Sequence, residues 1–507
     1  MKRWHLARRI ALVLVLAVPA AAQPAPAPDP APPAAASPAE PAPPEPARDP
    51  AQPSTEPTAA PTPTAPPGTG QPPPPPAPPE SAKPGPAPSP GQVTSKWTMT
   101  IYGFAELDIM RDSTQSFGDS PGNGLIFRPD TSPLQYNKGR TQTTARNSRL
   151  GVRMSAPETE GMRASGNIEM DFMGNQPTAS EGSFVNNGTF RIRAAYAKIE
   201  SDYVDMLAGQ YYALFGHQPF FFPMSIWFFS LPNQVFGRTQ QLRFSHTVKT
   251  DAVNVDVAVA AVRPPQRDAD VPDFQGGVKL GVNAWKGAHT GGSGYAAVDP
   301  LSLGVSGSVR HFRINELATA PATTHTANGW GVSLDAMIPI IPAASTKAKG
   351  NALTVTGSFA DGHGIGDLLG EISGGASFPV APPTPSGAAP TPNIDGGIVQ
   401  YDAAGRLHTL NWRTFMAGIQ YYLPPNGRVT VAANYTQGNS DNITDGLTGA
   451  ALTKVIKQSQ FVEATILGDI TPAVRAGVAW QRLEQTFGDE HHNPRNQRLE
   501  LSVYFFF

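Results

Sequence analysis

The stretch RLELSVYFFF, from Arg498 to Phe507, alternates large apolar residues with mostly polar ones. Successive side chains of a β-strand point to opposite faces. One face of such a strand carries Leu499, Leu501, Val503, Phe505 and Phe507. The other face carries Arg498, Glu500, Ser502, Tyr504 and Phe506. A strand that is apolar outside and partly polar inside is typical of a β-barrel in lipid.

The same alternation recurs from Lys96 onward. Only 40% of the residues are hydrophobic, and no later segment approaches the run of about 18 apolar residues that a spanning helix needs. The pattern therefore predicts an all-β fold, a transmembrane antiparallel β-barrel over 97–507. About sixteen strands are expected, at 97–111, 143–155, 162–174, 189–200, 203–214, 238–249, 252–263, 274–286, 301–314, 328–341, 351–361, 407–423, 427–438, 458–468, 473–487 and 495–507.

The connections between these strands alternate in length, as periplasmic turns and extracellular loops of such barrels do. The short ones are 157–161, 201–202, 250–251, 424–426 and 469–472. The long ones are 112–142, 361–406 and 439–457. One connection, 287–300, falls at a periplasmic position but is long for a turn.

The segment before the barrel divides into two parts. A basic start, an apolar stretch at 10–18 and a small-residue run at 20–22 predict a secretory signal peptide over 1–22, with an uncleaved membrane anchor as the alternative. Residues 23–96 are rich in proline and alanine, which predicts a disordered, extended periplasmic linker. This linker is either a plain spacer or a stalk that contacts the cell wall through 23–92.

Several stretches resemble trimeric bacterial porins. WTMTIYGFAELDIMRD (97–112) is similar to their first strand, and TARNSRLGVRMSAPETEG (144–161) to their second strand and turn. FRIRAAYAKIESDYVDMLAGQYYALFG (190–216) is similar to the fourth and fifth strands, and the last two stretches most resemble the DcaP-like porins. The resemblance implies a homotrimer in the outer membrane of a Gram-negative bacterium, in contact with its lipid. It also implies uptake of dicarboxylates and other small anions.

The last residues of the opening stretch suggest a role in barrel assembly. Val503, Phe505 and Phe507 resemble the terminal pattern that the barrel-assembly machinery reads in outer-membrane barrels. The alternative is a lipid-facing strand with an interfacial aromatic.

The segment FGHQPFFFPMSIWFFSLPNQVFG, from Phe215 to Gly237, is too apolar to remain in water. It occupies the place of the third extracellular loop of porins, which folds into the barrel and narrows it. We expect an inward constriction loop, with contact to the membrane surface or to another subunit as the alternative. Its candidate residues are Phe215, His217, Phe220, Phe221, Phe222 and Trp227.

Arginines occupy the faces of several strands that are opposite their apolar residues. An arginine at bilayer depth must face the lumen, because facing lipid costs about 2–4 kcal/mol. The expected pore-lining arginines are Arg149, Arg153, Arg191, Arg193, Arg243 and Arg475. Glu169 and Asp171 share the inner face of the strand at 162–174 and either line the pore or hold these arginines in place. Because the loop carries no carboxylate, the narrowest section should be net positive and favour anions.

Other function classes find little support. The net charge is −2, so no nucleic-acid footprint is visible, and the absence of cysteine excludes disulfides, thiolate metal sites and a lipid-modified N-terminal cysteine. No catalytic motif, cofactor site or metal site is predicted, and the cluster at 489–492 is interpreted as a solvated loop. The sequence thus predicts a non-enzymatic porin for small hydrophilic, preferably anionic solutes. A general weakly selective porin, a structural envelope-tethering barrel and a membrane-embedded hydrolase are the rivals.

Overall fold

The computed structural model describes residues 97–115, 120, 122, 126, 138–174, 188–291, 294–315, 323–370, 394–402, 404, 406–491 and 493–507. The expectations for the signal peptide and the Pro/Ala-rich linker lie outside the described residues. Among the described residues, no helix is long and apolar enough to cross a bilayer.

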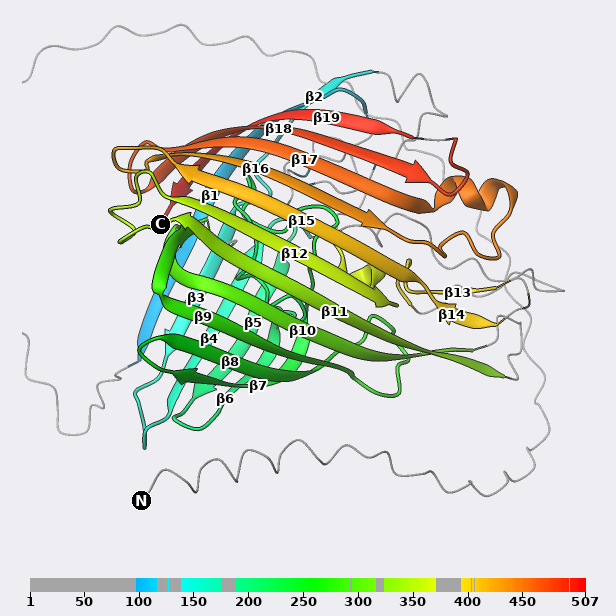
Figure 1. The fold of residues 1–507 in the computed structure, drawn as a ribbon, viewed down its shortest axis with the longest axis horizontal. Helices are drawn as coiled ribbons and strands as arrows, with labels where there is room; N and C mark the ends of the chain where they lie inside the picture. The colour runs from blue at the N-terminus through cyan, green and yellow to red at the C-terminus, as the bar shows by residue number, and fades with distance from the viewer. Residues whose placement is uncertain are drawn as a thin grey trace, which may run out of the picture. The chain divides into compact units, whose positions relative to one another are not determined.

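The described chain is almost entirely β-structure (Figure 1). The strands are β1 Thr98–Asp112, β2 Arg140–Thr144, β3 Arg149–Ser155, β4 Arg163–Asp171, β5 Arg191–Glu200, β6 Asp205–Tyr212, β7 Arg238–Lys249, β8 Val253–Val262, β9 Asp273–His289, β10 Ala297–Asn315, β11 Thr324–Ile341, β12 Leu353–His363, β13 Val399–Tyr401, β14 Leu407–Thr409, β15 Asn411–Tyr422, β16 Val429–Asn439, β17 Ile456–Asp469, β18 Val474–Phe487 and β19 Arg495–Phe506. Two short 3-10 helices, η1 Gly366–Leu368 and η2 Gly449–Lys454, lie in the long connections.

These strands form one closed antiparallel barrel. The sheet contains 17 segments, but β2 and β3 pair end to end with the same partner, β1, so they count as one interrupted strand and the barrel has 16 strands. The barrel closes where β1 pairs with β19, from Phe104 opposite Phe506 to Asp112 opposite Arg498. The predicted fold class and strand number are therefore confirmed.

Two predicted strands are interrupted. The strand expected at 143–155 breaks into β2 and β3, where Asn147 turns inward and donates from Nδ2 to Glu106 Oε2 at 2.6 Å. The strand expected at 407–423 begins as β14, which pairs with β13 in a separate two-stranded sheet. Sequence alternation continues across both breaks, so it could not reveal them.

The outer face of the barrel is apolar. Along β19 the side chains of Leu499, Leu501 and Phe505 are 42–54% exposed, whereas Glu500 and Ser502 are fully buried. Exposed apolar residues continue round the barrel, for example Ile168 on β4, Val305 on β10 and Ile466 on β17. A closed barrel with this surface is an outer-membrane β-barrel.

Removing Phe507 is expected to lower the yield of folded barrel sharply. Its backbone N–H donates to Gly103 O at 3.1 Å and its carbonyl accepts from Gly103 N at 3.0 Å, so these two bonds hold the end of the closing strand pair. The measurement is the fraction of heat-modifiable protein in the outer membrane. Phe507→Leu, which keeps both bonds and an apolar side chain, is the control. An undiminished yield without Phe507 would contradict the prediction.

Candidate functional site

The loop from Phe215 to Gly237 lies inside the barrel. Phe215, Phe221, Phe222 and Trp227 are at most 1% exposed. The predicted inward loop is therefore confirmed, and the alternative of a loop on the membrane surface is wrong. Phe220 and His217 are only partly buried, so they lie at the edge of the packed segment.

Polar bonds tie the loop to widely separated parts of the wall. Gly216 N donates to Ser306 Oγ on β10 at 2.7 Å. The carbonyl of Met224 accepts from Asn434 Nδ2 on β16 at 2.7 Å, and the carbonyl of Ile226 accepts from Tyr504 on β19. Because these strands lie around much of the circumference, the loop crosses the lumen and narrows it.

Arg149 on β3 binds the loop beside the contact from Tyr504. Its Nη2 lies 3.4 Å from the carbonyl of Trp227 and 3.3 Å from that of Phe228, and its guanidinium lies over the ring of Phe104, 4.9 Å from the centroid. The side chain is only 6% exposed. Arg149 faces the lumen as predicted, but its described contacts position the loop.

Arg191 and Arg193 on β5 form ion pairs with both carboxylates of β4. The Nε and Nη2 atoms of Arg191 donate to Asp171 at 3.0 and 2.7 Å. Arg193 donates to Glu169 and to Asp171, each at 2.8 Å. The two carboxylates therefore hold these two arginines in place, one of the two roles expected for them.

Three further arginines near this wall have no carboxylate partner among the described residues. Arg153 is exposed and lies 4.1 Å above the ring of Tyr102. Arg243 donates from Nη2 to the carbonyl of Tyr212 at 2.6 Å, and Arg238 lies 5.5 Å above the ring of Phe236. The sequence interpretation did not include Arg238, because it is the first residue of its strand and lies next to the apolar loop.

We define the basic wall as the inner face of β3–β7 that carries Arg149, Arg153, Arg191, Arg193, Arg238 and Arg243. The wall carries six arginines but only two carboxylates, Glu169 and Asp171, in its central part. Four positive charges therefore remain unpaired. Further along, Lys198 is paired with Glu200 and Asp205 near the short turn between β5 and β6. The basic wall therefore has a positive surplus.

Carboxylates on β1, β17 and β19 are buried. Glu106, Asp108, Glu463 and Glu500 are at most 4% exposed. Gln481 Nε2 donates to Glu500 Oε2 at 3.0 Å. Because these groups are covered, they do not face the open part of the lumen as the basic wall does. Their inward direction follows from strand alternation, but only the folded loops show that they are covered.

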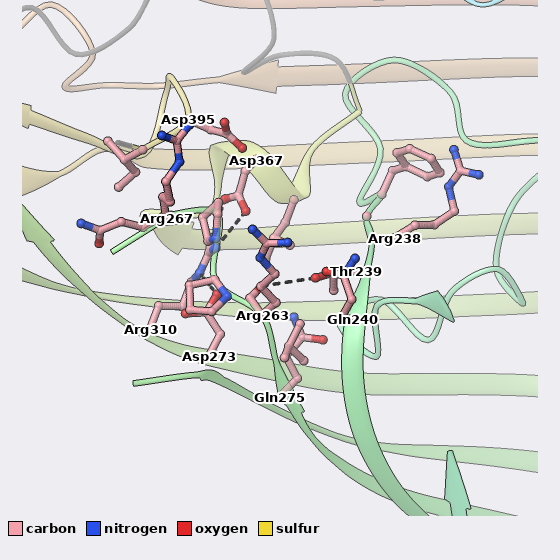
Figure 2. Close-up of a pocket in the computed structure, with 18 residues that line it drawn as sticks. Arg238, Thr239, Gln240, Arg263, Arg267, Asp273, Gln275, Arg310, Asp367 and Asp395 are labelled. Atoms are coloured by element: carbon pink, nitrogen blue, oxygen red, sulfur yellow. Dashed lines mark hydrogen bonds and ion pairs between the residues drawn. The ribbon is translucent and has the colours of Figure 1, made fainter. Parts of the chain in front are cut away.

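A cavity of about 760 Å³ lies next to the end of the loop, on the side of the long connections. Figure 2 shows Arg263, Arg267 and Arg310 around it, with Arg238 at one side. Arg310 is neutralised by Asp273 at 2.9 Å and also pairs with Asp367, whereas Arg238, Arg263 and Arg267 have no carboxylate partner in the part of the chain that the structure describes. We call this cavity the vestibule.

Part of the lining of the vestibule is apolar. It is formed by Phe236, Val262, Pro264, Pro265, Leu368 and Ile394. The lining of the cavity therefore combines four arginines with three carboxylates, Asp273, Asp367 and Asp395, and an apolar surface.

Solved structures share this arrangement of strands. The outer membrane channel DcaP of Acinetobacter baumannii superposes with a TM-score of 0.55 at 16% identity, over 81% of this chain and 97% of that chain. The barrel has the porin fold. An anion-selective porin from Comamonas acidovorans matches over 81% of this chain and 100% of its own, at 10% identity and a TM-score of 0.45. No family model and no curated protein matches the chain.

One predicted lumen residue of this porin-fold barrel lies away from the basic wall. Arg475 on β18 pairs with Asp469 at 2.6 Å and also donates to the carbonyl of Gly294. It faces inward as expected, but it contacts the connection between β9 and β10. Strand alternation gives the face of a residue and cannot give its partner.

Proposed function

We propose that the chain forms a water-filled channel for passive diffusion of small hydrophilic solutes across the outer membrane, with a preference for anions such as dicarboxylates. The observation that carries the proposal is the positive surplus of the basic wall beside an inward loop. A fixed positive field raises the local concentration of anions. Guanidinium groups stay charged and bind a carboxylate through two parallel hydrogen bonds.

The vestibule also supports a preference for anions. Arg263 and Arg267 are exposed at its edge, and Arg238 belongs to both the vestibule and the basic wall. An organic anion would meet these guanidinium groups first and then pass along the basic wall. The apolar lining residues of the vestibule would contact the apolar part of the organic anion.

The proposal extends to partners. The apolar outer face supports contact with outer-membrane lipid. The pairing of Phe507 with Gly103 is consistent with a closing strand that the barrel-assembly machinery recognises. A homotrimer and a contact of residues 23–92 with the cell wall remain part of the proposal on the sequence resemblance and composition alone. An enzymatic role is not proposed.

Single-channel recording in a salt gradient tests this function. The wild type is expected to prefer anions, and the preference should weaken with salt, because the screening length falls from about 10 Å at 0.1 M to about 3 Å at 1 M. The double variant Arg153→Gln with Arg243→Gln should reduce the anion-to-cation permeability ratio at least about twofold, since two of the four unpaired charges are lost.

The control is Arg406→Gln, because the Arg406 side chain is 82% exposed and already paired with Asp402. It should leave the reversal potential unchanged. Preference for cations in dilute salt would overturn the anion preference. An absence of current would favour the structural envelope-tethering barrel instead.

A further inference from the structure

The connection between β9 and β10 is longer than a turn requires. Val282 pairs with both Val253 of β8 and Leu301 of β10, so the wall ends there. Asn283 lies at this rim and donates from Nδ2 to the carbonyl of Thr250 at 2.9 Å. Beyond the rim, β9 and β10 continue to pair, up to His289 opposite Ala297. We call the described residues 283–291 and 294–300 the inward hairpin.

The base of the inward hairpin lies on the inner face of the neighbouring strands. The carbonyl of Lys286 accepts from Ala343 N at 3.1 Å. The carbonyl of Ala288 accepts from Thr354 Oγ1 on β12 at 2.7 Å and from Gln420 Nε2 on β15 at 3.1 Å. Because these side chains are buried inner-face residues, the hairpin turns back into the lumen.

The tip of the inward hairpin reaches further round the barrel. The carbonyl of Gly294 accepts from Arg475 on β18, and the ring of Tyr295 lies 4.9 Å from that of Phe506 on β19. The hairpin thus contacts β12 and β15, which lie across the barrel from the basic wall in the strand order, and β18 and β19, which lead through β1 to the near edge of that wall.

The inward hairpin also packs against the constriction loop. The rings of His289 and Phe220 are 5.2 Å apart, and His289 is 1% exposed. A Cβ built on Gly294 would lie 3.1 Å from the ring of Phe228, so a glycine allows this close approach. The loop and the hairpin therefore support each other.

One side of the inward hairpin is exposed. Tyr295 and Ala297 are exposed on it, whereas Ala288 and His289 are buried. The hydrogen bonds and ring contacts of the hairpin thus place it against β12, β15, β18, β19 and the constriction loop.

We propose that the inward hairpin is a second constriction and a selectivity-determining element. It lies on the periplasmic side of the loop and confines solutes to the passage beside the basic wall, where Arg153 and Arg243 lie. This inference rests on the proposed channel function. Without the hairpin, solutes would pass farther from the guanidinium groups, so both the size limit and the anion preference depend on it.

A hairpin-deletion variant tests the inference. Because Val282 and Leu301 are paired, residues 283–300 can be replaced by Asn-Gly, the preferred sequence of a two-residue hairpin turn. The conductance should rise at least about twofold, because a constriction in series is removed. The anion-to-cation permeability ratio should fall towards one. Unchanged conductance and reversal potential in a heat-modifiable barrel would overturn the inference.

A point variant covers the case in which the deletion does not fold. The chain has no cysteine, so Ala297→Cys provides a unique thiol on the exposed side of the hairpin. Attachment of a sulfonate-bearing thiosulfonate reagent should lower the anion preference, and a trimethylammonium-bearing reagent should raise it. Ala252→Cys, in the short turn between β7 and β8, is the control and should respond weakly to both.

The outcomes separate the two proposals. Equal responses at positions 297 and 252 would overturn the role of the hairpin and leave the channel function intact. An absence of current in the wild type would instead overturn the proposed function.

Discussion

Replacing Arg193 by Gln is expected to reduce the free energy of unfolding of the barrel by about 3–5 kcal/mol, the usual effect of removing one partner of a buried ion pair. The Arg193 side chain is 2% exposed and donates to both Glu169 and Asp171. Its loss leaves the partly buried Glu169 without its ion-pair partner and the fully buried Asp171 with Arg191 alone. Heat- or denaturant-induced loss of the folded, fast-migrating form in detergent measures the effect.

Arg191→Gln is the matched control. Arg191 also pairs with the buried Asp171, but the Arg191 side chain itself is 39% exposed, so its loss should cost less than that of Arg193. After this substitution Asp171 still has Arg193 as a partner. Equal destabilisation by the two variants would show that burial does not set the strength of these ion pairs.

Replacing Trp227 by Ala is expected to release the constriction loop and increase the single-channel conductance and its noise. Trp227 is fully buried, and its ring lies 5.8 Å from that of Phe461 on β17. Removing a buried ring of this size costs about 3–5 kcal/mol. The loop is an insertion between β6 and β7, so this loss should weaken its packing before the strand ladder of the barrel.

Phe229→Ala is the control for the loop. Phe229 is a neighbouring aromatic residue, but it is only partly buried, so its removal should change the conductance less. The barrel should remain heat-modifiable in both variants, and limited proteolysis should cut the loop faster in Trp227→Ala. A conductance like that of the wild type, together with unchanged proteolysis, would contradict the prediction.

Local alternation was sufficient to predict the barrel. All sixteen predicted strands correspond to strands of the structure, because each strand must present apolar residues to lipid whatever its neighbours are. The opening stretch illustrates this, since Phe505 is exposed and Glu500 is fully buried, as expected from their spacing. The inward loop was predictable for the related reason that so many aromatic side chains cannot stay in water.

Charge pairing was not predictable in the same way. Arg193, Arg153 and Arg149 all face the lumen, yet the first is paired with two carboxylates, the second with none among the described residues, and the third bonds carbonyl groups of the loop. Strand register and the path of the loop decide among these outcomes. The partners of Arg149 lie 78 and 79 residues away in the sequence.

The sequence by itself therefore determined the fold, the face of each strand residue and the length of the unusual connection at 287–300. Only the tertiary structure decided that this connection enters the lumen, and that Arg475 bonds Gly294 there. The physical reason is that every strand contacts lipid on one face and the lumen on the other. This local requirement alone produces the alternation of apolar and polar residues. The contents of the lumen depend on barrel closure, which brings strands far apart in sequence around a shared interior.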